Sequence, residues 1–123
     1  EGSLTRDPGL WPMRGKTGAV RIALEQGIPL VPAGHWGTQH LMPRYSKRLS
    51  LFPRKTITVK IGDPVDLSRF RGRSLDTATL NEATAVVMDA ITHLLEDLRG
   101  EAAPATRWNP AEHDQKETGR FEA

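Results

Sequence analysis

The chain has 123 residues, enough for one domain with a modest hydrophobic core. Hydrophobic residues make up 37% of it and charged residues 26%, and no apolar run approaches the roughly 20 residues that a membrane-spanning helix needs. Cysteine is absent, which excludes a thiol nucleophile, a disulfide framework and a cysteine metal site from these residues.

Charge is distributed unevenly along the chain. Residues 1–60 contain ten Lys and Arg against three acids, a net charge of +7, whereas residues 61–123 have a net charge of −5. This asymmetry predicts a polyanionic partner such as anionic lipid headgroups, acyl-CoA phosphates or nucleic acid. Nucleic acid is the weaker candidate and is not expected, because Trp36, Tyr45 and Phe52 show no spacing for stacking bases.

The first 15 residues are predicted to form a loop, and their first six combine a carboxylate, a glycine, hydroxyls and a cation. Gly2 allows the backbone to approach a ligand closely, and the Ser3 hydroxyl can donate to an anionic oxygen. Glu1 suits such a site only if it accepts a hydroxyl proton or orients a cation. A ligand with both hydroxyl and phosphate groups satisfies all three residue types.

Three cations near this loop are candidates to bind a phosphate: Arg6, Arg14 and Lys16. Arginine suits bidentate contact with phosphate, and all three can donate charge-assisted hydrogen bonds. The alternative is a surface turn in which Glu1 and Arg6 form an ion pair worth ~0–1 kcal/mol.

A helix and a strand are expected next. Residues 16–26 have helical spacing and end at Gly27, a predicted C-cap, and residues 28–33 form an apolar run typical of a buried parallel strand. At the end of this strand we expect His35, Trp36 and Gln39 to line a ligand site. Neither His35 nor His40 has a carboxylate at metal-ligand or dyad spacing, so hydrogen-bonded structural histidines are expected.

Residues 43–55 mix cations with Leu49, Leu51 and Phe52, a pattern that suits either a lipid-headgroup interface or a solvated basic loop. Residues 56–61 alternate and predict a half-buried strand. The longest helix is expected at residues 75–99, with Asp76 or Thr77 as N-cap, Gly100 as its end, and a surface ion pair between His93 and Asp97. One domain is therefore expected over residues 1–100, followed by a flexible polar tail over residues 101–123.

Two of these segments resemble a known family. Glu1-Gly2-Ser3 followed by Arg6 resembles the Pro-Glu-Gly-Thr/Ser-Arg block of the glycerolipid acyltransferases of the 1-acyl-sn-glycerol-3-phosphate (lysophosphatidate) type, and residues 27–33 resemble that family's later apolar block with two prolines. The resemblance covers about residues 1–66. Leu4-Thr5 is interposed before the arginine, which leaves Arg14 and Lys16 as rivals to Arg6.

The resemblance implies an α/β fold with a mostly parallel sheet flanked by helices, of which this chain is the C-terminal half. It places substrate binding at Glu1, Gly2, Ser3, Arg6, Arg14 and Lys16, and an acyl or acceptor pocket wall at Ile28, Pro29, Val31 and Pro32. The family's catalytic His-x-x-x-x-Asp block does not occur after any of the four histidines. The catalytic residues are therefore expected upstream of Glu1. The 123 residues of this chain, taken alone, are expected to have no acyltransferase activity.

The implied reaction moves an acyl group from acyl-CoA or acyl carrier protein to the hydroxyl of 1-acyl-sn-glycerol 3-phosphate, giving phosphatidate. No metal and no cofactor beyond the thioester co-substrate is expected, and the partners are the lysophospholipid and an anionic membrane, at its cytoplasmic face. Two alternatives stay open: transfer to glycerol 3-phosphate or another lysophospholipid, and a non-catalytic module that binds anionic phospholipid.

Overall fold

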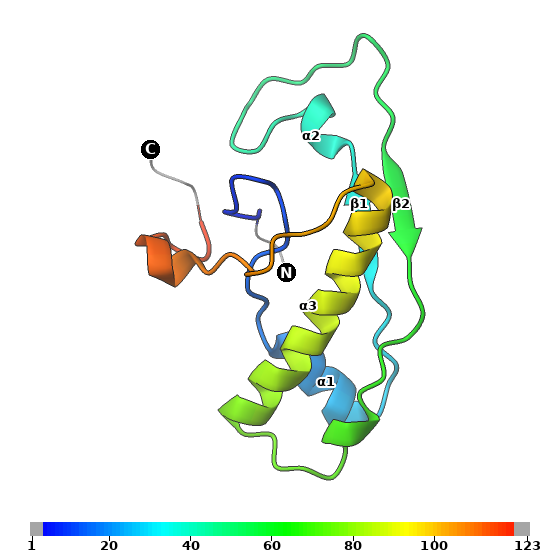
Figure 1. Cartoon of the computed structure of the whole chain (residues 1–123), viewed down its shortest axis with the longest axis vertical. Coiled ribbons are helices and arrows are strands. Elements are labelled where there is room, and N and C mark those ends of the chain that lie inside the picture. The colour runs from blue at the N-terminus through cyan, green and yellow to red at the C-terminus, as the bar shows by residue number, and fades with distance from the viewer. Residues whose placement is uncertain (1–3, 120–123) are drawn as a thin grey trace.

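The fold was analysed in a computed structural model that describes residues 4–119. Four helical segments and two strands alternate along the first hundred residues, and a short 3-10 turn follows (Figure 1). In chain order they are α1 (Gly18–Gln26), β1 (Ala33–Trp36), α2 (Thr38–Leu41), β2 (Thr58–Ile61), η1 (Ser68–Phe70), α3 (Thr77–Arg99) and η2 (Pro110–His113). No helix in this part of the chain is long and apolar enough to cross a bilayer.

The long helix α3 organises the fold; it begins at Thr77, two residues after the predicted start at residue 75, and its predicted N-cap at Asp76 and end at Gly100 are confirmed. The Asp76 side chain accepts a hydrogen bond of 2.8 Å from the Thr79 amide, so Asp76 is the N-cap. Gly100, with φ of 68°, ends the helix in the left-handed conformation that glycine adopts readily. The helix lies diagonally across the molecule, with α1 beside its N-terminal half and the two strands beside its C-terminal half (Figure 1).

The core lies between α1, α3 and the 3-10 turn η1. The predicted C-cap of α1 is confirmed, because Gly27 has φ of 65° and its amide donates to Ala23. Phe70 and Ala83 are fully buried at the centre of this core. The buried cluster consists of Val20, Ala23, Leu67, Phe70, Leu80, Ala83 and Val87.

The two strands pair in an antiparallel register that runs from Ala33 opposite Ile61 to Trp36 opposite Thr58. The described residues therefore contain no parallel strand pair, and the mostly parallel sheet stays a prediction. Gly34 lies against the side chains of Leu94 and Leu95, so α3 covers this face of the sheet. Side chains alternate along a strand, which leaves Val59 and Ile61 on the opposite face, 63% and 70% exposed.

The predicted strand at residues 28–33 is wrong, because β1 begins only at Ala33. Pro29 and Pro32 lack backbone N–H groups and so cannot donate to a ladder. The segment nevertheless runs beside residues 62–65: the Gly62 amide donates to the Pro32 carbonyl (2.9 Å), and the Val65 amide donates to the Leu30 carbonyl (2.8 Å). The predicted half-buried strand at 56–61 is shorter, at 58–61, and more exposed.

The described part of the predicted tail, residues 101–119, contacts the N-terminal loop. The Arg14 amide donates to the Trp108 carbonyl at 3.0 Å, and Arg6 donates to the carbonyls of Lys116 (3.1 Å) and Gly119 (2.6 Å). These contacts bring the two ends of the described chain together (Figure 1).

Candidate functional site

A cleft of about 410 Å³ lies between the N-terminal loop, the β1–α2 segment and the C-terminal half of α3. This volume is in the range of small-molecule sites, which combine an apolar lining with a few polar groups. Its apolar lining includes Leu4, Leu10, Trp11, Trp36, Met42, Ile91 and Leu95, and its polar lining Thr5, His35, Thr38, Gln39, Arg44 and Tyr45. The predicted lining residues His35, Trp36 and Gln39 are thus all at the cleft.

The N-terminal wall of the cleft is a turn closed by its own side chains. The Asp7 carboxylate accepts hydrogen bonds from the amides of Gly9 (3.0 Å) and Trp11 (3.1 Å). The Thr5 hydroxyl donates to the Trp11 carbonyl at 2.6 Å. Since Asp7 is only 8% exposed, these bonds satisfy a buried carboxylate and hold the loop in one shape.

Arg44 and Tyr45, which follow α2, fasten this turn to the opposite wall. Arg44 Nη1 donates to the carbonyls of Thr5 (2.9 Å) and Asp7 (2.6 Å). The Tyr45 hydroxyl accepts a hydrogen bond from Arg6, whose guanidinium also lies over the Tyr45 ring at 5.2 Å. Arg44 is the one Lys or Arg among the residues that line the cleft.

A second arginine, Arg99, packs against two tryptophans that line the cleft. The Arg99 guanidinium carbon lies 3.8 Å from the ring centre of Trp11 and 4.2 Å from that of Trp36, so the cation packs against both indoles. Arg99 also donates to the Gly9 carbonyl at 2.9 Å and to Glu101 at 2.6 Å. It thereby joins the N-terminal turn, β1 and the end of α3.

Gln39 contributes a polar group that the protein itself does not satisfy. Its Oε1 accepts a hydrogen bond from the Gly37 amide at 3.0 Å. Its Nε2 is buried and is the one side-chain nitrogen or oxygen of this kind, among residues 4–119, with no hydrogen-bond partner. A buried donor of this type costs about 1–3 kcal/mol unless an acceptor reaches it, and Gln39 is one of the residues that line the cleft.

The predicted substrate-binding residues are only partly brought to the cleft. Glu1, Gly2 and Ser3 lie outside the described residues, although Leu4, directly after them, lines the cleft. Arg6 is 4% exposed and donates to Tyr45 and to the carbonyls of Lys116 (3.1 Å) and Gly119 (2.6 Å). Its visible contacts are therefore structural.

The other two predicted phosphate ligands, Arg14 and Lys16, are exposed on the segment that leads into α1 and do not line the cleft. The predicted pocket wall is not there either, because the cleft is lined by residues 33–36 instead of the preceding run. In that run Pro32 is buried, whereas Ile28, Pro29 and Val31 are exposed.

Among the described residues, one histidine lies within ion-pair distance of a carboxylate. His93 Nδ1 lies 2.9 Å from Glu96, whereas Asp97 pairs with Lys60 of β2, so the predicted pair of His93 with Asp97 is wrong. No group of three or more His, Asp or Glu among residues 4–119 could hold a metal ion.

A smaller hollow of about 270 Å³ lies between α3 and residues 103–108, and its chemistry is different. Asp7, Asp89 and Glu96 line it. The Ala103 amide donates to Glu96 and, together with His93, lowers the pKa of this carboxyl, which keeps it charged at neutral pH. Arg107 and His93 line the hollow as well, and Arg107 pairs with Asp89, so its charges are largely paired with one another, and the cleft with its apolar walls is the better candidate for a lipid.

Comparisons with protein-family models, with curated proteins and with solved structures give no match to this chain. The residues of the cleft and the family resemblance of residues 1–6 and 27–33 are therefore the observations that bear on function.

Sequence reasoning missed several residues that shape the cleft, among them Leu10, Met42, Leu95 and Arg99, and it assigned Arg44 only to a basic loop. Arg44 follows Pro43 only a few residues after the predicted lining residues, so its position was a signal that this segment continues the site. Arg99 carries no local signal, because its partners lie at the other end of the chain.

Proposed function

We propose that this chain forms the acceptor-binding part of an O-acyltransferase that converts 1-acyl-sn-glycerol 3-phosphate to phosphatidate, with acyl-CoA or acyl carrier protein as donor. The observation that supports this most is the composition of the cleft. Its apolar walls suit an acyl chain, and Arg44, Tyr45 and Gln39 provide donors for the polar end of the same molecule. The cleft also reaches Leu4, next to the Glu-Gly-Ser block whose resemblance suggested this activity.

The proposed reaction needs few groups beyond those that bind the lipid. The acceptor hydroxyl oxygen attacks the thioester carbonyl carbon, and the new C–O bond forms as the C–S bond breaks. The hydroxyl proton passes to a general base, and the thiol leaves. We assign this base to a His-x-x-x-x-Asp block outside these 123 residues, and a general base of this kind contributes typically ~10²–10⁴ in rate.

In this proposal the cations have separate roles. Arg6 orders the loop through Tyr45 and two backbone carbonyls, and Arg44 holds the loop at the mouth of the cleft. Arg14 and Lys16 are exposed but do not line the cleft, so in this proposal the acceptor phosphate meets the donors of the cleft and not these two cations. Acceptors with a shorter apolar part, such as glycerol 3-phosphate, or with another headgroup are the alternatives within this reaction class.

The open face of the sheet is the surface on which further elements of the proposed fold would pack. Val59 and Ile61 expose large apolar side chains on the face opposite α3. In the proposed α/β fold further elements would cover this face, although an antiparallel pair such as β1 and β2 can also leave one face in water.

The experiment measures thiol release from acyl-CoA by the full gene product, with lysophosphatidate, glycerol 3-phosphate or no acceptor. Thiol release that depends on lysophosphatidate supports the proposal, and preference for glycerol 3-phosphate would move it to that acceptor. A folded protein that releases no thiol with any acceptor, from either acyl-CoA or acyl carrier protein, would refute acyl transfer and leave the non-catalytic lipid-binding module.

A further inference from the structure

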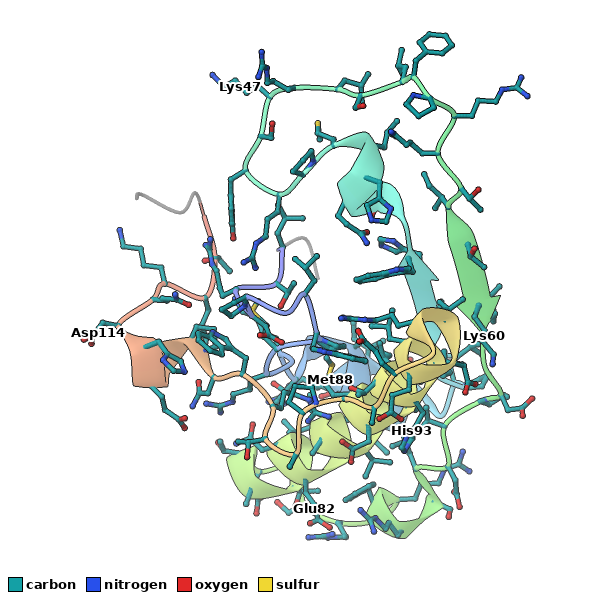
Figure 2. The ribbon with its side chains drawn as sticks, turned by 45° about the horizontal axis from the view of Figure 1, so that its top comes forward. Lys47, Lys60, Glu82, Met88, His93 and Asp114 are labelled. Carbon is teal, nitrogen blue, oxygen red and sulfur yellow. The ribbon has the colours of Figure 1, made fainter. Side chains whose placement is uncertain are left out.

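The connection from α2 to β2 is a long segment without helix or strand, residues 43–57, which we call the projecting loop. It extends from the end of the molecule where α2 lies and returns to β2 (Figure 1). Figure 2 shows Lys47 of this loop at the far end of the molecule from Glu82 of α3.

The middle of the projecting loop exposes three large apolar side chains. Leu49 is 57% exposed, Leu51 55% and Phe52 84%. Neighbouring apolar groups left in water are unfavourable and mark interaction surfaces when they cluster. This tip therefore needs a partner that can receive hydrocarbon.

Cations flank the apolar tip on both sides. Lys47-Arg48 precedes it and Arg54-Lys55 follows it, with Arg48 and Arg54 exposed. Acids are absent from the whole of residues 26–62, so nothing within that segment neutralises these charges. The combination predicts a partner that is anionic at its surface and apolar beneath it.

We propose that the projecting loop docks on anionic phospholipid bilayers, with Leu49, Leu51 and Phe52 in the interface and the four flanking cations against headgroup phosphates. Aliphatic side chains favour hydrocarbon over nucleic acid, where affinity for single strands comes from base stacking on aromatic platforms. The loop offers one phenylalanine and two leucines, so a membrane is the partner that uses all three.

The base of the projecting loop connects this surface to the cleft. Arg44 and Tyr45 line the cleft and are bonded to the N-terminal turn, so the loop and the cleft mouth are held together. If the proposed acyl transfer holds, a docked loop would let a lysophospholipid enter the cleft from the leaflet; this consequence rests on that proposal, whereas docking itself does not.

Co-sedimentation of the 123-residue chain with vesicles tests docking. We expect binding to phosphatidylcholine vesicles that contain phosphatidylglycerol, weaker binding to phosphatidylcholine alone, and loss of binding at high salt. A loop variant with Lys47, Arg48, Arg54 and Lys55 all changed to Gln should bind at least ~10²-fold more weakly, since each such cation is worth roughly fivefold.

A variant with the same net charge is the matched control. It changes Arg21, Arg69, Arg71 and Arg73, all exposed and outside the loop, to Gln. It should bind as the unchanged protein does, with thermal unfolding confirming that both variants fold. Equal losses in the two variants, or tighter binding to single-stranded RNA than to vesicles, would overturn the proposal.

Insertion of the tip is tested separately, because the chain contains no cysteine and allows a single labelled one. An environment-sensitive fluorophore on Phe52→Cys should shift to the blue when anionic vesicles are added, and the same label on Ile61→Cys, which is 70% exposed on the sheet, should not. No shift at position 52, or an equal shift at both positions, would contradict insertion. None of these measurements involves turnover, so their failure is distinct from failure of the acyl-transfer proposal.

Discussion

The Arg99 guanidinium carbon lies 3.8 Å from the centre of the Trp11 ring, although the two residues lie almost at opposite ends of the chain. A second indole, that of Trp36, lies 4.2 Å from the same carbon. A planar cation between two aromatic faces, with its N–H groups on Gly9 and Glu101, fixes three segments around the cleft.

Replacing Arg99 with Met should lower the free energy of unfolding by about 2 kcal/mol, because cation–π contact and charge-assisted hydrogen bonds are lost together. Arg99→Lys should recover part of this loss, since it keeps the charge without the planar group. Urea unfolding followed by tryptophan fluorescence measures both. Arg21→Met is the control, because its ion pair with Glu25 is exposed, and a loss as large there would contradict a specific role for Arg99.

Gly37→Ala should destabilise the protein by more than about 2 kcal/mol. Gly37 has φ of 110°, and a Cβ there would lie 2.2 Å from the Thr56 carbonyl oxygen. Gly18→Ala, at the start of α1 with open space around it, should instead stabilise by about 0.5 kcal/mol. Equal melting temperatures of the two variants would contradict the positive φ of Gly37 and its close approach to Thr56.

Capping of α3 predicts a pH dependence. The Thr79 amide, helped by its hydroxyl, lowers the pKa of Asp76 from its ordinary value of 3.8. A carboxyl with a lower pKa in the folded state stabilises fully above the unfolded value, and this contribution is lost as pH falls through the folded value. The melting temperature of Asp76→Ala should therefore be a few degrees below that of the unchanged protein at pH 7. This difference in melting temperature should shrink as the pH falls below 3.8.

Asp76→Asn is the control for this titration, because asparagine caps a helix about as well as aspartate and does not ionise. Its difference from Asp76→Ala should stay constant with pH. A gap between the unchanged protein and Asp76→Ala that persists to low pH would contradict the charged cap.

Gln39→Met should weaken binding of lysophosphatidate about tenfold while changing the free energy of unfolding by less than about 1 kcal/mol. Removal of the unpartnered Nε2 offsets loss of the hydrogen bond from Gly37, but a ligand acceptor loses its donor. Trp11 and Trp36 line the cleft, so titration of tryptophan fluorescence reports binding. Gln26→Met, exposed at the end of α1, is the matched control, and equal affinity of the two variants would exclude Gln39 as a ligand contact.

The helices were predictable because their signals are local. Apolar spacing, the Asp76 cap and the terminal glycines Gly27 and Gly100 define α1 and α3 without tertiary information. The first strand was misplaced because an apolar run was interpreted as a strand despite Pro29 and Pro32, which cannot donate ladder hydrogen bonds. Its antiparallel pairing with β2 depends on how the projecting loop returns, which composition does not encode.

The cleft was predictable only in part, for a similar reason. Trp36, the last residue of β1, and Gln39, shortly after it, were predictable because ligand sites lie at strand ends. Its other walls come from the N-terminal turn and from Ile91 and Leu95 of α3, which meet only in the folded chain. Arg6 was predicted from its chemistry alone, and its burial against Tyr45 and the carbonyls of residues 116 and 119 depends on where the C-terminal segment packs.

The central claim is that this cleft, and not the apolar run before it, holds the acyl acceptor. Met42 lines the cleft, whereas Ile28 does not. Both side chains are about half exposed, Met42 at 51% and Ile28 at 50%, so a tryptophan at either position should leave the fold intact. The measurement is kcat/KM for lysophosphatidate-dependent thiol release by the full gene product. Met42→Trp should lower it at least about tenfold by filling the cleft, with Ile28→Trp near the unchanged protein. A large loss in Ile28→Trp with none in Met42→Trp would contradict the account.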